Sequence, residues 1–164
     1  MLGGARSGKS VFAERIAGEW GEPVLYVATA TASDDEMAER IAMHRAQRPH
    51  AWRTVEVPLR IAEHLGGELG DATTVLVEDL TLLLSNLMAE DERGAEARAV
   101  DEVNALLALS THVVLVSNEV GMGIVPPYPL GRVFRDALGR LNQVTGAACA
   151  EVYLLVAGLP LQLK

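Results

Sequence analysis

The sequence predicts an α/β fold in which helices cover both faces of a mostly parallel sheet. Short apolar runs alternate with segments of helical periodicity along the 164 residues. Hydrophobic residues make up 49% of the chain and aromatic residues only 4%, which favours buried parallel strands over an all-β sandwich. A glycine-rich segment at residues 3–10 precedes the first helical pattern, as in folds that bind phosphate groups at such a turn.

The segment GGARSGKS at residues 3–10 matches the phosphate-binding loop pattern G-x-x-x-x-G-K-[ST]. Glycines let backbone N–H groups turn towards an anion, and the following helix adds the positive end of its dipole. Lys9 would reach the β- and γ-phosphates, and the Ser10 hydroxyl would help to hold Mg²⁺. Of two lysines among fourteen basic residues, only Lys9 lies away from the chain end. The alternative is a plain glycine turn. The predicted loop contacts are Gly3, Gly4, Ala5, Arg6, Ser7, Gly8, Lys9 and Ser10.

Length and composition predict a single domain over residues 1–164. The net charge of −8 argues against nucleic acid as a partner, because phosphate-backbone contact needs clustered Lys and Arg. Cys149 is the one cysteine, so an intramolecular disulfide is excluded and a reducing cytoplasm fits. The sequence contains neither a signal segment nor an apolar run long enough to span a membrane.

In the first third of the chain, residues 11–20 predict a helix because Phe12, Ile16 and Trp20 recur at helical spacing. Residues 24–29 form an apolar run that predicts a buried strand with a polar carboxyl end. Further elements follow in order, and each is marked by a cap, a proline or a periodic pattern. They are a helix capped by Asp34, a strand at 52–57 and a helix opened by Pro58.

In the middle of the chain, residues 74–79 (TVLVED) predict a strand that ends in two carboxylates. Residues 80–88 are mostly apolar and predict a buried helix, followed by an acidic turn at 90–92. Residues 95–109 show the helical spacing of apolar side chains and predict another helix.

In the last third, residues 112–118 (HVVLVSN) predict a strand. A Gly/Pro-rich loop at 119–131 leads into a long helix at 130–148. Residues 151–157 predict the last main strand, and residues 161–164 predict a short edge strand. Intervals this regular between strands and helices predict parallel pairing.

The first strand is predicted to be truncated, because only Met1 and Leu2 precede Gly3. Phosphate-binding loops follow a buried strand, and each large buried side chain contributes roughly 1.5 to 3 kcal/mol. We therefore expect the natural start to lie upstream of Met1.

Glu78 and Asp79 lie where nucleotide-binding α/β proteins place a carboxylate that orders the metal or its water. We predict Ser10, Glu78 and Asp79 as the metal site. A solvated pair of carboxylates at a strand end is the alternative.

His44 is the most informative of the four histidines, because Arg40, Arg45 and Arg48 surround it in the sequence. Three guanidinium groups favour the neutral, nucleophilic imidazole and suit a triphosphate. A neutral imidazole beside bound phosphates can attack phosphorus and form a phosphoramidate. The alternative is a histidine packed on a helix face beside Met37.

Two further segments follow predicted strands. Thr29 and Thr31 could hydrogen-bond a base, ribose or phosphate, although single hydroxyls are weak signals. The loop at residues 118–126 (NEVGMGIVP) is longer than most connections of its kind, which indicates a shaped binding loop.

With these motifs in order, the chain resembles the bifunctional adenosylcobinamide kinase/adenosylcobinamide-phosphate guanylyltransferase family over essentially its whole length. The resemblance depends on these segments in this order and spacing. They are GGARSGKS (3–10), LYVAT (25–29), DDEMAERI (34–41), HRAQRP (44–49), WRTVE (52–56), LVED (76–79), NEVGMGIVP (118–126) and FRDALGRLNQ (134–143).

The resemblance implies a P-loop, RecA-like fold, a trimer, and Mg²⁺ with GTP or ATP as substrate. It implies that the enzyme phosphorylates adenosylcobinamide and then transfers GMP from GTP through a guanylylated His44, with Lys9 as a further catalytic residue. Beyond the loop, the nucleotide-binding residues it implies are Thr29, Ala30, Thr31, Arg45, Ala46, Gln47, Arg48, Glu56 and Glu78. The family usually has a short apolar strand before the loop, which this chain lacks.

Two other functions remain open from the sequence. One is a P-loop small-molecule kinase without a covalent step. The other is a nucleotide-dependent binding module that has lost catalysis.

Overall fold

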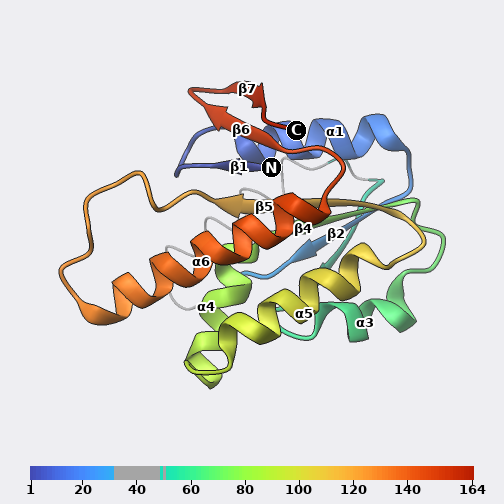
Figure 1. The fold of residues 1–164 in the computed structure, drawn as a ribbon. Coiled ribbons are helices and arrows are strands. Elements are labelled where there is room, and N and C mark those ends of the chain that lie inside the picture. The colour runs from blue at the N-terminus through green and yellow to red at the C-terminus, as the bar shows by residue number, and fades with distance from the viewer. Residues whose placement is uncertain (32–48, 50) are drawn as a thin grey trace.

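The computed structural model describes residues 1–31, 49 and 51–164, and these residues form an α/β structure (Figure 1). Elements are numbered along the chain. The helices are α1 (Lys9–Trp20), α3 (Ile61–Glu68), α4 (Leu80–Glu90), α5 (Ala95–Leu107) and α6 (Pro129–Ala148). The strands are β1 (Leu2–Gly3), β2 (Val24–Ala28), β3 (Arg53–Glu56), β4 (Thr74–Glu78), β5 (His112–Asn118), β6 (Tyr153–Val156) and β7 (Leu159–Gln162).

The strands form one sheet in the order β3-β2-β4-β5-β1-β6-β7. All neighbours in this order pair in parallel except β6 and β7, which are antiparallel. The predicted α/β class with a mostly parallel sheet is therefore confirmed. Parallel pairing brings the carboxyl ends of β1 to β5 to the same edge of the sheet.

Helices cover both faces of the sheet, as the sequence predicts (Figure 1). On one face, α3, α4, α5 and α6 pack against the strands through a large apolar cluster that includes Leu83, Val103 and Leu138. On the other face, α1 packs through a smaller cluster that includes Ala13 and Ala17. Since β4 and β5 bury side chains on both faces, their sequences are continuous apolar runs.

Several element boundaries differ from the sequence prediction. The helix expected from Pro58 begins at Ile61, after Arg60 adopts a left-handed φ of 53°. The helical spacing predicts Trp20 on the buried face of the first helix, but its side chain is 39% exposed, and its ring packs against His112 in a tilted arrangement, 5.5 Å between centroids. The small residues Ala13 and Ala17 are fully buried against the sheet instead.

The end of the chain forms a tight hairpin rather than a strand, a loop and a separate edge strand. β6 pairs with β7 from Val156↔Leu159 to Tyr153↔Gln162. The two residues of the turn, Ala157 and Gly158, both have positive φ, at 52° and 81°. This turn geometry moves the edge strand to Leu159–Gln162 from the predicted 161–164.

The first strand is present but very short. β1 contains two residues and lies between β5 and β6 in the interior of the sheet. Leu2 pairs with Ser117 of β5 and with Leu154 of β6. The central position before the glycine-rich loop is thus occupied, although β5 beside it is seven residues long.

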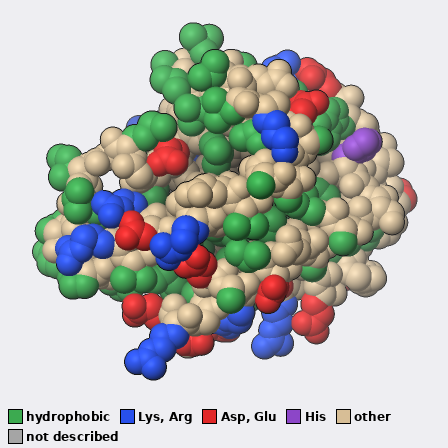
Figure 2. All heavy atoms as spheres, viewed as in Figure 1, with side chains coloured by type: hydrophobic (Ala, Val, Ile, Leu, Met, Phe, Trp, Pro, Cys, Tyr) green, Lys and Arg blue, Asp and Glu red, His purple; other side chains and the backbone are tan. Residues whose placement is uncertain are grey.

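Apolar side chains gather on two parts of the surface in Figure 2, over the β6–β7 hairpin and over the loop between β5 and α6. In the hairpin, Leu159 is 72% exposed, and in the loop Ile124 is 96% exposed. Among the described helices, none is both long and apolar enough to cross a membrane.

Candidate functional site: a phosphate loop at the sheet edge

The glycine-rich loop of residues 3–10 connects β1 to α1 at the carboxyl edge of the sheet. Gly3 has no room for a side chain, because a Cβ atom there would meet the Ser7 hydroxyl and lie 2.9 Å from the carbonyl oxygen of Leu155. Gly8 adopts a left-handed φ of 93° and directly precedes the first residue of α1. The segment therefore forms a tight turn, and the amino end of α1 points into the concave side of this turn.

Two side chains of this loop are buried although they are polar. Lys9 is 8% exposed, and its Nζ lies 3.4 Å from the carbonyl oxygen of Gly4, so the ammonium group folds back over the loop. The Ser7 hydroxyl is buried without a hydrogen-bond partner among the described residues. A buried donor without a partner and a buried ammonium group both favour an anion at this place.

The final turn of the chain supports the loop from behind. The amide of Gly158, in the β6–β7 turn, donates to the carbonyl oxygen of Ser7 at 2.9 Å. A Cβ atom at Gly8 would lie 3.1 Å from the Cα of Gly158, so the two turns are in close contact.

Glu78, at the end of β4, connects the loop to the neighbouring strands. Its Oε1 accepts a hydrogen bond from the Ser10 hydroxyl, and its Oε2 accepts one from the Tyr26 hydroxyl at 2.9 Å. The structure thus brings together Ser10 and Glu78, which are 68 residues apart in the sequence and which the sequence assigns to one metal site.

Asp79 caps the next helix. Its Oδ1 accepts from the amide of Leu82 at 2.8 Å, and its Oδ2 accepts from Nδ2 of Asn118 at 3.3 Å. Burial, together with the nearby charge of Glu78, raises the pKa of Asp79, whereas the Leu82 hydrogen bond and the Lys9 charge lower it. Both of its oxygens therefore already hold protein groups in place.

Thr29 is fully buried, and its hydroxyl holds the turn after β4. It donates to the carbonyl oxygen of Asp79 at 2.8 Å and accepts from the amide of Asp79 at 2.7 Å. Ala30 is half-buried and Thr31 is exposed at the same edge. Glu56 is exposed at the end of β3, in register with Ala28 of β2.

Other predicted residues fall outside the part of the chain that the structure describes. These are His44, Arg45, Ala46, Gln47 and Arg48. Their roles stay predictions.

Sequence reasoning missed Tyr26, and it placed Asn118 at the start of a candidate binding loop without its contact with Asp79. Tyr26 is 2% exposed inside an apolar strand, and only its hydroxyl reaches Glu78. Asn118 ends β5 and binds both Asp79 and the Thr81 hydroxyl, the latter at 3.0 Å. A polar residue at the last position of a buried strand is the signal that could have identified Asn118.

The parts of this site define a class of protein. A tight glycine loop between a parallel strand and a helix, with a serine that contacts a carboxylate from a second strand, is typical of P-loop nucleotide-binding α/β proteins. Among the described residues, no group of three or more His, Cys, Asp and Glu side chains could hold a metal ion.

Comparison with known proteins identifies the family. The family model described as cobinamide kinase / cobinamide phosphate guanyltransferase, CobU, matches residues 1–163. The chain is 46% identical to the bifunctional adenosylcobalamin biosynthesis protein CobP of Pseudomonas aeruginosa, over all of this chain and 95% of that protein. It is 42% identical to the proteins named CobU of Escherichia coli and of Salmonella typhimurium, over all of this chain and 98% of each relative. The chain belongs to the CobU family.

Proposed function

We propose that this chain is an adenosylcobinamide kinase and adenosylcobinamide-phosphate guanylyltransferase, and that residues 1–164 act as one catalytic domain. Family membership supports both activities. The observation that carries the proposal for this chain is the contact of Ser10 with Glu78 beside the buried Lys9, because it joins the loop to the carboxylate that such catalysis needs.

In the kinase step, the nucleotide phosphates would lie in the loop of residues 3–10. A hydroxyl oxygen of adenosylcobinamide attacks the γ-phosphorus, the bond to the β–γ bridging oxygen breaks, and the nucleoside diphosphate leaves. Lys9 and the loop amides stabilise the charge on the phosphoryl oxygens in the transition state. The hydroxyl proton leaves to solvent or to a nearby base.

The residues at this edge fit Mg²⁺. The Ser10 hydroxyl and the Glu78 carboxylate are oxygen ligands, and Mg²⁺ takes few protein ligands because phosphates and water supply the others. When bound, Mg²⁺ neutralises charge on the phosphates. Tyr26 would fix the orientation of Glu78. Asp79 would act on the metal through bound water rather than as a direct ligand, since both of its oxygens already accept hydrogen bonds.

In the guanylyltransferase step, a ring nitrogen of His44 would attack the α-phosphorus of GTP, and pyrophosphate would leave. A phosphate oxygen of adenosylcobinamide phosphate then attacks the same phosphorus, and the bond to the imidazole breaks. Residues Arg45 to Arg48, Thr29 to Thr31 and Glu56 are proposed to contact the nucleotide. The four described members of this set, Thr29, Ala30, Thr31 and Glu56, lie at the same sheet edge as the phosphate loop, which supports the proposal.

The test uses intact mass after incubation with GTP and Mg²⁺. We expect an acid-labile GMP adduct in the parent chain and in His64→Ala, a matched change of another histidine, and no adduct in His44→Ala. The His44→Ala variant should still phosphorylate adenosylcobinamide. Turnover without an adduct in the parent would instead support a simple kinase, and binding without turnover would support a binding module.

The trimer implied by the resemblance stays a prediction. The exposed apolar side chains of the hairpin and of the loop after β5 are candidate contacts between subunits, because such patches often mark interfaces. Light scattering of the purified chain would test it.

A further inference from the structure

The β5–α6 loop, residues 119–128, is both apolar and exposed. From residue 120 to residue 131 the chain has no charged side chain, although 22% of all its residues are charged. Met122 is 78% exposed and Ile124 is 96% exposed, and Val125 and Tyr128 are exposed as well. In Figure 2, apolar side chains gather over this loop. Contiguous exposed apolar surface commonly marks a binding site.

This loop begins at the carboxyl edge of the sheet, beside the phosphate loop. The amide of Glu119 donates to the carbonyl oxygen of Gly3, the first residue of the phosphate loop, at 2.9 Å. One residue earlier, Asn118 contacts Asp79 and the Thr81 hydroxyl. Figure 1 shows the chain leaving the end of β5, extending outward from the sheet and turning back into α6. The apolar segment therefore starts where the nucleotide phosphates are proposed to lie.

Hydrogen bonds and prolines hold the shape of the β5–α6 loop. Nη1 of Arg132 donates to the carbonyl oxygens of Pro126 and Pro127, at 2.9 Å to each. Near the start of the loop, the amide of Gly121 donates to the Glu119 carboxylate. Proline rings also fix φ at three of the four positions from 126 to 129. A surface that already has one shape loses little conformational entropy when a ligand covers it, which favours binding.

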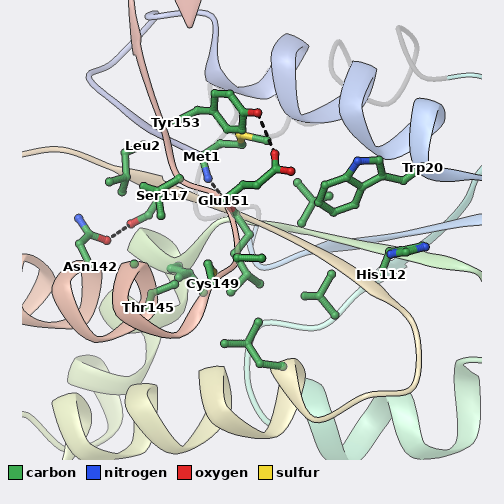
Figure 3. Close-up of a pocket in the computed structure, with 18 of the residues that line it drawn as sticks. Met1, Leu2, Trp20, His112, Ser117, Asn142, Thr145, Cys149, Glu151 and Tyr153 are labelled. Carbon is green, nitrogen blue, oxygen red and sulfur yellow. Dashed lines mark hydrogen bonds between the residues drawn. The ribbon is translucent and has the colours of Figure 1, made fainter. Parts of the chain in front are cut away.

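A cavity of about 260 Å³ lies at the opposite end of the sheet, where residues 111–115 and 149–153 line it (Figure 3). In Figure 3, Trp20 and His112 lie together on one side of it. Trp20 is the last residue of α1 and His112 is the first of β5, so both lie far along their elements from the phosphate loop. Pockets for drug-sized ligands have volumes of about 300 to 1,000 Å³. Adenosylcobinamide is larger than such ligands, so this cavity cannot hold it.

Adenosylcobinamide carries a small reacting group on a large body. Its hydroxyl lies at the end of a short aminopropanol arm, and its body is a broad macrocycle with methyl groups and uncharged carboxamides at the rim. When the hydroxyl meets the γ-phosphate, the macrocycle must lie outside the phosphate loop but within the length of the arm. The β5–α6 loop begins at that distance and is uncharged and apolar, so its chemistry matches that of the macrocycle rim.

We propose that residues 119–128 form a corrinoid platform, on which the macrocycle of adenosylcobinamide lies while its arm enters the phosphate loop. Met122, Ile124 and Val125 contact the methyl groups of the rim, and the ring of Tyr128 packs against the macrocycle. This inference rests on the proposed function.

The β6–β7 hairpin is also apolar and exposed, but it lies on a different side of the phosphate loop. Its turn supports that loop from behind, through the hydrogen bond from Gly158 to Ser7. The platform instead continues from Asn118, on the side of the carboxylates that are proposed to hold the metal. The hairpin therefore remains a candidate contact between subunits, whereas the position of the platform suits the substrate.

The test changes the platform and measures each substrate separately. Met122→Ser combined with Ile124→Ser removes two exposed apolar side chains, so the variant should fold. We expect KM for adenosylcobinamide in the kinase reaction to rise about 10-fold or more, and kcat to stay within about twofold of the parent, because the lost contacts hold the body of the substrate and not the reacting atoms. Formation of the GMP adduct from GTP alone involves no corrinoid and should keep its rate.

Leu161→Ser is the matched control, because it changes an exposed apolar side chain of β7 and should leave KM for adenosylcobinamide unchanged. Three results would overturn the platform. The first is an unchanged KM in the double variant. The second is an equal rise with Leu161→Ser, which would assign the effect to apolar surface in general. The third is a lower molar mass of the double variant in light scattering, which would identify the loop as a contact between subunits.

Failure of the proposed function would give a different result, because it concerns the parent chain. A folded parent that catalyses neither reaction would contradict the proposed function. Equilibrium dialysis with adenosylcobinamide, followed by its visible absorption, needs no turnover and then decides the platform. Binding by the parent that the double variant loses would support the platform, and absence of binding by the parent would overturn it.

Discussion

The two ends of β1 differ sharply in what surrounds them. At its carboxyl end, Gly3 leads into a loop held by Gly158, Lys9, Ser10 and Glu78. At its amino end, Met1 borders a cavity of about 260 Å³, and burial lowers the pKa of its amino group to about 6. The chemistry proposed for this protein needs the first end to be rigid, whereas the second end contributes only stability. Changes at the two ends should therefore be separable, with loss of turnover at one and shifts in unfolding free energy at the other.

The largest effect is expected for Lys9→Ala. The buried ammonium group folds back over the loop, with its Nζ 3.4 Å from the carbonyl oxygen of Gly4. We expect kcat/KM to fall by about 10²- to 10³-fold in both reactions, since a preorganised charge is removed from the transition state. Steady-state assays of each reaction would check this. Unchanged turnover of both reactions would remove the loop from the mechanism.

A smaller loss is expected for Glu78→Gln. The amide keeps the size of the side chain and removes the charge that would hold Mg²⁺, so turnover should fall by roughly 10- to 100-fold and need more Mg²⁺. Tyr26→Phe is the matched control, because it removes only the hydrogen bond to Oε2 and should cost a few-fold. If both variants lose the same activity, Glu78 acts through its position and not through its charge.

The buried Met1 amino group should make the free energy of unfolding depend on pH. The pKa of the Met1 amine is lowered from 8.0 to about 6 in the folded chain, so the unfolded chain binds more protons between these values. The free energy of unfolding should thus rise by roughly 2 kcal/mol from pH 6 to pH 8, and the gain should be lost as the pH falls again.

Urea denaturation at pH 6, 7 and 8 would measure this change. Acetylation of the Met1 amine provides the control, because other titrating groups are unaffected and the rise specific to the amine should disappear. A rise of equal size in the acetylated chain would assign it to other groups.

The smallest effect is expected for Thr29→Val, which changes the turn after β4. Valine keeps the shape but leaves the amide of Asp79 without its buried partner, so the free energy of unfolding should fall by about 1 to 2 kcal/mol. Thr31→Val, at an exposed position, should change it by less than about 0.5 kcal/mol. Chemical denaturation of both variants would compare them. Equal free energies of unfolding for the two variants would show that the Thr29 hydroxyl does not stabilise the turn after β4.

Sequence patterns predicted the sheet well, because each buried strand is a continuous apolar run that ends in polar residues. The strand at 112–118 agrees with β5, and the run at 74–79 differs from β4 only because Asp79 becomes a helix cap. The hairpin was missed because Ala157 adopts a positive φ that its residue type does not favour.

At the site, the contact between Ser10 and Glu78 could be predicted, since parallel strands bring their carboxyl ends to one edge. The contribution of Tyr26 could not be predicted in the same way. A strand buried on both faces is apolar at every position, so polar and apolar residues do not alternate, and the sequence does not indicate which side chains lie towards the loop. The hydrogen bond from Gly158 to Ser7 depends on the order of strands in the sheet, which spacing along the chain does not determine.

The position of β1 between β5 and β6 has a consequence for the order of assembly. β1 acquires both of its sheet neighbours only after residues 112–118 and 153–156 have been synthesised. The support from Gly158, which follows β6 in the sequence, is completed later still. The glycine turn of residues 3–10 therefore lacks the hydrogen bond from Gly158 until residue 158 has been synthesised, and it cannot reach its final geometry before then.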